Sequence, residues 1–253
     1  MGLDIYAGTL TRYYARNWKT SVQQWGEANG VNVNVVRNEP DDVQIAPPEE
    51  ILAGVTGWKE QFLAVYGQHI TEPLVWNEDN DVTPYYTDKP DWCAMEALFL
   101  YIACKYMRKE VPKMVKKNFS VFDEPVYKDF KQSERGVFSL TDGAGWWLPI
   151  RDAFMVDSCL PTGQEKTFGT LGMLKSELIE INAIEWKADE ETILKWNTEE
   201  GYPTDALYRN GKITNVAKNE EYDTVSLAKF AFSILWQAVK HAEEHGTLII
   251  FDY

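Results

Sequence analysis

The sequence predicts a single α+β domain built around a mixed β-sheet. Apolar residues alternate near the N-terminus and are continuous over 247–251, and two long segments near 90–107 and 225–245 are apolar enough for buried helices. No stretch rich in Gly, Ser or Pro divides the chain, and no internal repeat is visible. With 253 residues and 45% apolar side chains, the chain is long enough to bury a full hydrophobic core.

The first 35 residues predict two strands and a helix between them. Residues 3–7 alternate between apolar and other side chains, as a strand does. Large side chains recur at helical spacing over 11–29, and glycines at positions 26 and 30 indicate where this helix ends. Residues 31–35 alternate valine with asparagine, which predicts the second strand.

Two further helices are predicted before residue 110. The segment Pro47–Glu50 is a good helix start, because proline suits the first turn and carboxylates there interact favourably with the helix dipole. Apolar residues at helical spacing continue this helix to about Val65. The next helix begins near Pro90 and continues to about Met107. It is apolar on nearly every side, which indicates a buried central helix.

The middle of the chain is less regular. Segments 137–140 and 148–156 are predicted strands, and the small residues of the turn 142–145 separate them. Leucine and isoleucine recur with helical spacing over 171–181, although 170–174 also fits a strand.

The last third predicts helices, a hairpin and a final strand. A short helix is expected over 189–196. Asn-Gly at 210–211 lies within the β-like segment 207–213, and this dipeptide supplies both positive-φ positions of a type I′ hairpin turn. A long helix over 225–245 stops at a glycine suited to a helix C-terminus, and the continuously apolar segment 247–251 predicts a buried strand.

Composition excludes several classes of protein. The chain has 39 acidic and 25 basic residues and a net charge of −14, whereas nucleic-acid-binding faces are basic. The most apolar run, Trp92–Cys104, is shorter than the ~20 residues that cross a bilayer, and no secretory signal is visible. Three cysteines without a C-x-x-C pair predict reduced thiols. We therefore expect a cytoplasmic protein without a cofactor, a nucleic-acid partner or a membrane partner. The oligomeric state stays open.

Charge is grouped in blocks along the chain. Residues 38–96 carry a net charge of −11, residues 105–117 carry +5, and residues 177–205 carry −7. We favour the interpretation that these blocks are solvated faces, with the basic segment lying near acidic ones. The alternative is an acidic face that docks the basic surface of a partner protein. The basic segment itself has the charge to bind a phosphate or an acidic protein.

The segment His241–His245 matches the H-x-x-E-H pattern of a zinc peptidase family. Residues i and i+4 share a helix face, so two imidazoles can bind one metal ion. However, the pattern lies in the last turn of its helix, directly before Gly246. We expect both histidines at the surface, without a structural metal. We also expect Glu243 and Glu244 to raise the pKa values of the imidazoles.

Other catalytic motifs are incomplete. No glycine precedes Lys166-Thr167 as a phosphate-binding loop requires, and neither G-x-G-x-x-G nor G-x-S-x-G occurs. The sequence therefore predicts no nucleotide site by these routes.

The most unusual stretch is Asp142–Asp152, in which a small turn leads to Trp146, Trp147 and Arg151. Neighbouring residues on a strand point to opposite faces, so one ring would line a pocket or an interface if one face met solvent. The alternative, which we favour, is a sheet covered on both faces with both rings buried. Candidate binding residues are Trp146, Trp147, Arg151, Asp142, Tyr85 and Tyr86. Trp76, near the acidic segment 78–81, is a weaker candidate.

Carboxylates offer a second kind of site. Asp4 on the first strand and Glu96 in the apolar helix are expected to be buried, and buried carboxylates with raised pKa values are enriched at active sites. Glu96 is expected to pair with Arg108, Arg151 or a tyrosine hydroxyl, and Asp252 is a further strand-end carboxylate. A hydrolase would need several of one set to converge in a pocket. That set is Asp4, Glu96, Asp142, Asp152, Asp157, His241, Glu244 and His245.

Three short segments carry a resemblance. Met1–Tyr6, Leu160–Gly163 and Phe168–Thr170 resemble a group of phage and bacterial proteins that share an MGLD start and an LPT…FG segment. The resemblance implies no activity and no functional residue. It favours a bacterial or phage cytosolic protein.

Two functions follow as hypotheses. The first is a non-enzymatic, acidic protein-binding module of the inhibitor, immunity or phage counter-defence type, whose partner has a basic surface. The alternative is a carboxylate- or metal-dependent hydrolase. Convergence of the carboxylates and histidines in one pocket separates the two hypotheses.

Overall fold

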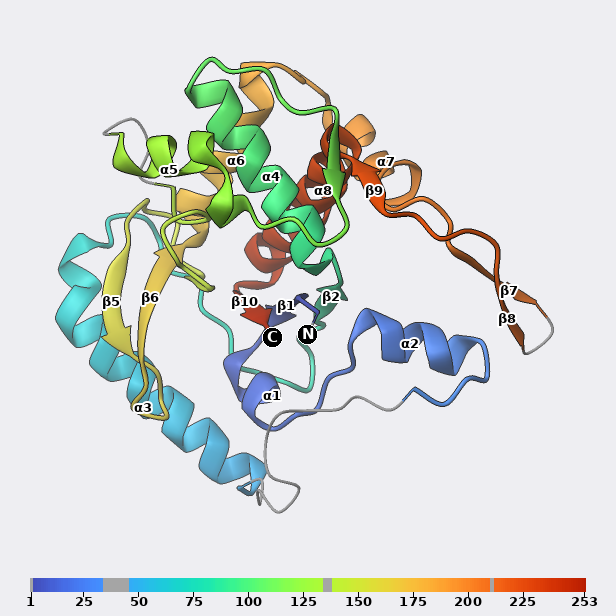
Figure 1. Ribbon diagram of the computed structural model, residues 1–253. Coiled ribbons are helices and arrows are strands. Elements are labelled where there is room, and N and C mark those ends of the chain that lie inside the picture. The colour runs from blue at the N-terminus through green and yellow to red at the C-terminus, as the bar shows by residue number, and fades with distance from the viewer. Residues whose placement is uncertain (1, 34–45, 134–137, 210–211) are drawn as a thin grey trace.

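A mixed six-stranded sheet forms the centre of the molecule (Figure 1). The structure, a computed structural model, describes residues 2–33, 46–133, 138–209 and 212–253. The strand order is β2-β1-β10-β4-β6-β5. In chain order these strands are β1 (Asp4–Gly8), β2 (Tyr86–Asp88), β4 (Trp146–Leu148), β5 (Val156–Cys159), β6 (Glu165–Thr170) and β10 (Leu248–Asp252). This arrangement confirms the predicted α+β class with the terminal strands inside the sheet.

The first and last strands pair with each other. β1 and β10 are antiparallel, with Asp4 opposite Asp252 and Gly8 opposite Leu248. The other pairs of this sheet are also antiparallel, except for β4 and β6, which are parallel. The chain ends therefore meet in the sheet interior rather than at an edge.

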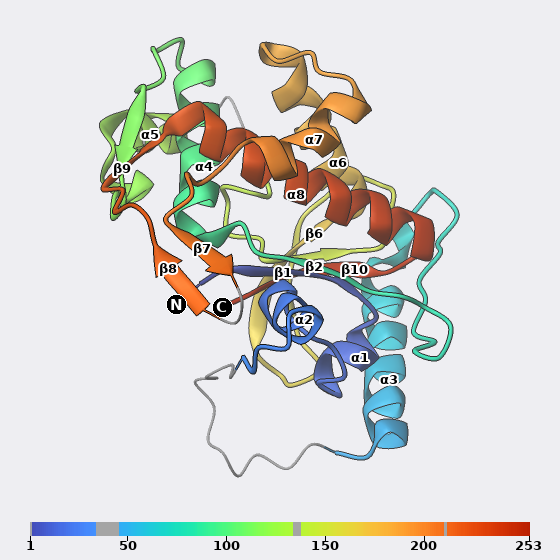
Figure 2. The same cartoon turned by 90° about the vertical axis from the view of Figure 1, so that its right-hand side faces the viewer.

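Helices cover both faces of the sheet (Figure 2). The helices of the first half are α1 (Leu10–Tyr14), α2 (Ser21–Ala28), α3 (Pro48–Tyr66), the 3₁₀ turn η1 (Gly67–His69) and α4 (Asp91–Tyr106). Those of the second half are the 3₁₀ turn η2 (Val121–Asp123), α5 (Pro125–Gln132), α6 (Leu171–Ile184), α7 (Glu190–Glu199) and α8 (Thr224–His245). Helices α4, α6 and α8 pack on one face, and α1 and α3 pack on the other. Among the described residues, no helix is both long and apolar enough to cross a membrane.

The two central helices are buried as predicted. Residues 97–104 of α4 are all buried, and α8 buries a broad stripe that includes Phe232 and Leu235. Gly246 ends α8 with φ of +63°, the left-handed conformation that favours glycine at a helix C-terminus. The chain then turns directly into β10.

Both faces of the sheet meet apolar side chains. Trp147 lies in the core beneath α4, α6 and α8, whereas Trp146 lies in the aromatic cluster toward α1 and α3. Trp58 and Phe62 of α3 pack 5.9 and 6.2 Å from Phe168, between ring centroids. This is the two-sided arrangement that explains consecutive tryptophans on one strand.

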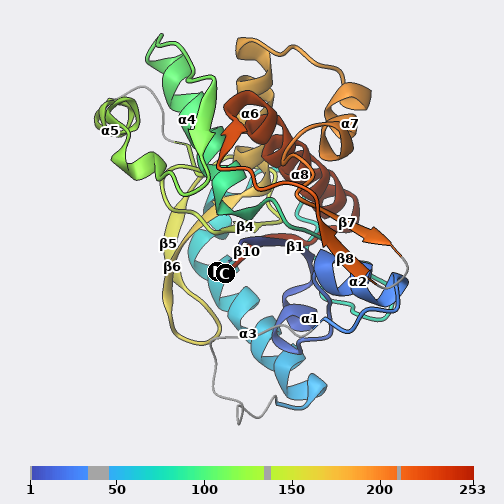
Figure 3. The ribbon, with the colours of Figure 1, turned by 45° about the vertical axis from the view of Figure 1, so that its right-hand side comes forward.

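Two small sheets lie outside the main sheet. β3 (Met114–Lys116) pairs with β9 (Glu221–Asp223), and β7 (Ala206–Arg209) pairs with β8 (Lys212–Asn215). The second pair forms the predicted hairpin, although its Asn-Gly dipeptide lies outside the described residues. The hairpin lies beside α2 (Figure 3), where Tyr208 packs edge-on against Trp25 at 5.3 Å between ring centroids.

The predicted helix over 11–29 is wrong, because the chain forms α1 and α2 with a break between them. Arg16 has φ of +54°, which ends the first helix, and Thr20 with Gln23 forms a capping box that starts the second. Residues 31–33 form no strand, and the rest of the strand predicted over 31–35 lies outside the described residues. The predicted helices from 48, 171 and 189 are present.

The strand predictions of the middle segment are partly wrong. The long strand expected over 148–156 is absent, because only its end residues lie in strands, Leu148 in β4 and Val156 in β5. The strand β6 was not predicted. Residues 138–140 form a turn rather than a strand, and Val137 lies outside the described residues. Glu177 of α6 explains this turn, because its carboxylate accepts hydrogen bonds from the backbone N–H groups of Ser139 and Leu140.

Glu177 is a buried carboxylate within the helix-side core. Its side chain also accepts a hydrogen bond from Ser139 Oγ at 2.8 Å, and the same Oγ accepts one from Trp147 Nε1 at 2.8 Å. Burial raises the pKa of Glu177 from 4.5 to about 7, against the lowering effect of its hydrogen-bond donors.

This pKa shift predicts a pH-dependent stability. The folded protein holds a proton on Glu177 that the unfolded chain releases between pH 4.5 and 7. Its stabilising contribution is complete below pH 4.5 and is lost as the pH rises through 7, by roughly 3 kcal/mol in total. The free energy of unfolding is measured in urea at pH 5 and pH 8 for the wild type and for Glu177→Gln, which has no group to titrate at this position. Between pH 5 and pH 8, the wild type should lose more stability than the variant does. A difference between the two proteins that stays constant with pH would contradict the prediction.

Candidate functional site

The segment from Ile70 to Tyr85 connects η1 to β2 without a helix or strand, and we call it the 70–85 loop. Irregular segments of this length are uncommon in compact domains and are often functional. The loop carries four carboxylates and no Lys or Arg. It lies where the end of β1, the start of α1 and the end of α8 come together, as its hydrogen bonds show.

Arg12 of α1 binds backbone carbonyl groups of the loop. Its side chain donates hydrogen bonds to the carbonyl of Thr83 at 2.8 Å and to the carbonyl of Asn80. The guanidinium also lies over the ring of Tyr85, 5.1 Å from its centroid. Arg12 is 9% exposed, so its charge is committed to the loop rather than to solvent.

Glu78, a residue of the loop itself, attaches the loop to α1. Its Oε2 accepts hydrogen bonds from the backbone N–H and the hydroxyl of Thr11, both at 2.9 Å. Its Oε1 accepts a bond of 2.9 Å from Trp76 Nε1, and the Trp76 ring is buried in the aromatic cluster. Thr9 Oγ1 adds a further bond to Asn80. These contacts hold an irregular backbone in one conformation.

Hydrogen bonds also fix the start and the middle of the loop. Asp152 accepts hydrogen bonds from the backbone N–H groups of Thr71 and Glu72 at 3.0 and 3.1 Å. The Thr71 hydroxyl also donates to Asp152. This hydroxyl bond is the main cause of a lowered pKa of Asp152, and the two backbone bonds contribute to the same shift. Asn77 N–H donates to the carbonyl of Gly246 at 2.7 Å, which joins the loop to the end of α8.

The outward side chains of the loop are acidic and apolar. Apart from Thr71, the exposed residues are all acidic or apolar, namely Glu72, Pro73, Leu74, Val75, Asp79, Asp81, Val82 and Pro84. Val75 and Val82 are 53% and 75% exposed. An acidic segment interspersed with exposed aliphatic groups is suited to contact another macromolecule, since the aliphatic groups bury area and the carboxylates select charge.

His241 and His245 lie beside this loop at the end of α8. Both are half-buried rather than fully at the surface, and their ring centroids are 4.6 Å apart. The expectation of a raised pKa is wrong for His241. Burial and the neighbouring His245 lower its pKa, and these effects outweigh the Pro84 carbonyl and Glu244.

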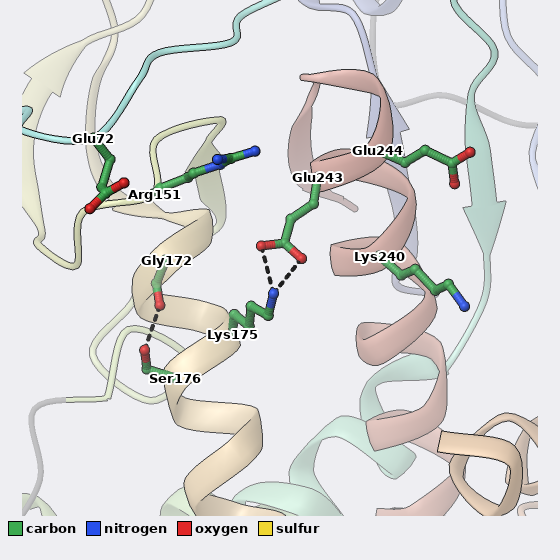
Figure 4. Close-up of a pocket in the computed structure, with 8 residues that line it drawn as sticks. All are labelled: Glu72, Arg151, Gly172, Lys175, Ser176, Lys240, Glu243 and Glu244. Atoms are coloured by element: carbon green, nitrogen blue, oxygen red, sulfur yellow. Dashed lines mark hydrogen bonds and ion pairs between the residues drawn. The ribbon is translucent and has the colours of Figure 1, made fainter. Parts of the chain in front are cut away.

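A shallow hollow of about 690 Å³ opens between α6 and α8 (Figure 4). Its charged lining consists of Arg151, Lys175 and Lys240 with Glu72, Glu243 and Glu244.

The charges around this hollow are balanced. Lys175 forms an ion pair with Glu243 at 2.8 Å, and Lys240 pairs with Glu190 of α7. The first turn of α6 is also occupied, because Gly172 N–H donates to the Ile150 carbonyl and Thr170 caps the helix. A Cβ at Gly172 would lie 1.8 Å from the Arg151 carbonyl oxygen, so glycine permits this close contact. The hollow therefore offers no excess of either charge.

The six predicted binding residues do not form one site. Trp146 and Trp147 are buried on opposite faces of the sheet, and Asp142 pairs with Lys131. Arg151 lines the hollow. Tyr85 ends the 70–85 loop, and Tyr86 begins β2 with its ring 6.2 Å from His241.

The carboxylates of the hydrolase hypothesis also remain apart. Asp142 binds Lys131, Asp152 binds the loop backbone, and Asp157 accepts from Thr167 Oγ1 at 2.7 Å. Glu96 accepts from Val121 N–H at 2.7 Å rather than from the expected arginine or tyrosine, and burial raises its pKa. Within the described ranges, no three His, Cys, Asp or Glu side chains are placed to hold a metal ion.

The basic segment 105–117 lies beside acidic residues, as the solvated-face interpretation expects. Lys105 pairs with Glu185, and Lys116 lies opposite Glu221 in the β3–β9 pair.

Sequence reasoning missed Arg12 and Glu78 as anchors. An available signal was the length of 70–85, which lacks both helical and strand periodicity and contains Asn-Glu-Asp-Asn-Asp.

Comparisons with protein-family models, curated proteins and solved structures found no match. The case for a functional site therefore depends on the geometry of the chain itself.

The anchoring role of Arg12 gives a stability prediction. Arg12→Ala leaves the carbonyls of Thr83 and Asn80 without their donor, and we expect a loss of about 2–4 kcal/mol in the free energy of unfolding. Limited proteolysis should then cut within 70–85 first. The control is Arg151→Ala, since the Arg151 side chain makes no hydrogen bond or ion pair among the described residues, and it should change stability by less than about 0.5 kcal/mol. Equal effects of the two substitutions would contradict the assignment.

Proposed function

We propose that the chain is a protein-binding module that recognises a basic surface on its partner through the 70–85 loop. Such a role is the kind that inhibitors, immunity proteins and phage counter-defence proteins perform without catalysis. The observation that carries the proposal is a long acidic loop held in one conformation by buried polar contacts, while its acidic and aliphatic side chains face outward.

The fixed conformation supports a binding role on energetic grounds. A mobile loop loses conformational entropy when it binds, whereas a loop already held by Arg12 and Glu78 avoids most of that loss.

Charge supports the same proposal. The net charge of −14 and the absence of any Lys or Arg within 70–85 favour rapid, salt-dependent association with a basic surface. Val75 and Val82 supply the apolar area that a stable interface needs at its centre. The hydrolase alternative lacks a comparable observation, because its carboxylates lie on separate elements.

The test is capture of a stoichiometric protein partner from the native host by the wild type and two charge-reversal variants. The loop variant is Glu72→Lys/Asp81→Lys, and both side chains are exposed and make no hydrogen bond or ion pair within the described residues. The control variant is Glu110→Lys/Glu165→Lys, which alters net charge equally outside the loop.

We expect low-salt binding that weakens as salt rises, with at least a tenfold loss of affinity in the loop variant and little change in the control. Affinity is measured by titration calorimetry with the purified partner. The proposal fails if no partner is captured at any salt concentration, or if both variants bind as well as the wild type.

A further inference from the structure

His241 and His245 occupy one face of the last two turns of α8. They are four residues apart, the spacing that places two side chains one above the other on a helix. Their ring centroids are 4.6 Å apart, and the ring planes are inclined by 54°. This distance allows small side-chain rotations to bring one nitrogen of each ring to a common ion, given metal–nitrogen bonds of about 2.0–2.1 Å.

We propose that His241 and His245 form a binding site for a divalent transition-metal ion, with water completing the coordination. Imidazole nitrogens suit Ni²⁺, Cu²⁺ and Zn²⁺, whereas Ca²⁺ and Mg²⁺ prefer oxygen ligands. The inference does not depend on the protein-binding proposal.

The helix end that carries the pair is held firmly. Terminal turns of helices often fray, but here Gly246 and Thr247 both donate backbone hydrogen bonds to the carbonyl of Ala242. The Gly246 carbonyl in turn accepts from Asn77, and β10 begins two residues later. The two imidazoles are therefore presented from a fixed backbone.

Residues before and within β2 contact the ring of His241. Nε2 of His241 lies 3.4 Å from the carbonyl oxygen of Pro84, and the ring of Tyr86 lies 6.2 Å from that of His241. A backbone carbonyl beside one ring nitrogen is a common outer contact of metal-bound histidine, because it fixes the tautomer and orients the ring.

The set of ligands defines the type of site. In the part of the chain that the structure describes, no third His, Cys, Asp or Glu joins the pair in a group fit for a metal ion. Structural zinc sites use four protein ligands. The pair is thus an exchangeable site at which water fills the remaining coordination positions.

Titration calorimetry with NiCl₂ tests the proposal on untagged protein. Cys159 is exposed and is replaced by serine in every sample, so that no thiol competes for the ion. The variants are His241→Ala and His245→Ala, and the control is His69→Ala, an exposed histidine on η1 far along the chain from the pair.

We expect one ion per chain, at least a tenfold loss of affinity in either pair variant, and unchanged binding in the control. NMR spectra of the imidazole groups give an independent readout in protein with all three histidines, in which Ni²⁺ should first perturb the signals of His241 and His245. Absence of binding, binding that survives both pair substitutions, or first perturbation of His69 would overturn the proposal.

Discussion

The antiparallel pairing of β1 with β10 is the interaction on which the rest of the structure depends. Both strands lie inside the sheet and are buried on both faces, so each face needs its own layer of helices. One pair of this ladder is polar, because Asp4 lies opposite Asp252 at its end.

Burial raises the pKa of Asp4, and Lys89, 3.6 Å away, opposes that shift. Tyr13 donates to Asp252 at 2.6 Å.

The same pair of strands positions the 70–85 loop. Arg12 lies in the helix that directly follows β1, and Gly246 lies in the turn that directly precedes β10. One contacts the loop at Asn80 and Thr83, and the other contacts it at Asn77. The acidic loop is therefore attached to the most deeply embedded part of the sheet, although its outer side chains are exposed. Loops that a rigid scaffold holds in place commonly carry binding residues.

Much of the fold follows from local patterns. The helices α4 and α8 and the strands β1 and β10 were predictable from their apolar residues, which recur at a regular period in α8 and β1 and are nearly continuous in α4 and β10. The break between α1 and α2 was predictable in principle from the capping box at Thr20 and Gln23. The patterns also favoured burial of both Trp146 and Trp147, which the structure shows.

Other parts depend on contacts between distant segments. β6 contains few apolar residues, and its place in the sheet comes from parallel pairing with β4. The turn at 138–140 depends on Glu177, nearly 40 residues later in the chain. The loop anchors Arg12 and Glu78 are polar residues whose partners in α1 or in the loop lie 67 to 71 positions away, so neither periodicity nor spacing indicates them. Such contacts are visible only after the chain has folded.

The placement of the first and last strands side by side also has a consequence for how the protein acquires its structure. Gly8 ends β1 and Leu248 begins β10, so β1 leaves the ribosome long before its main partner is made. Until then, the edge of β1 that later pairs with β10 has unpaired backbone groups and is open to association with other chains. Contacts of such long range slow folding, because a large loop must close before the pairing stabilises it. The nascent protein is therefore expected to need protection from aggregation until β10 has emerged.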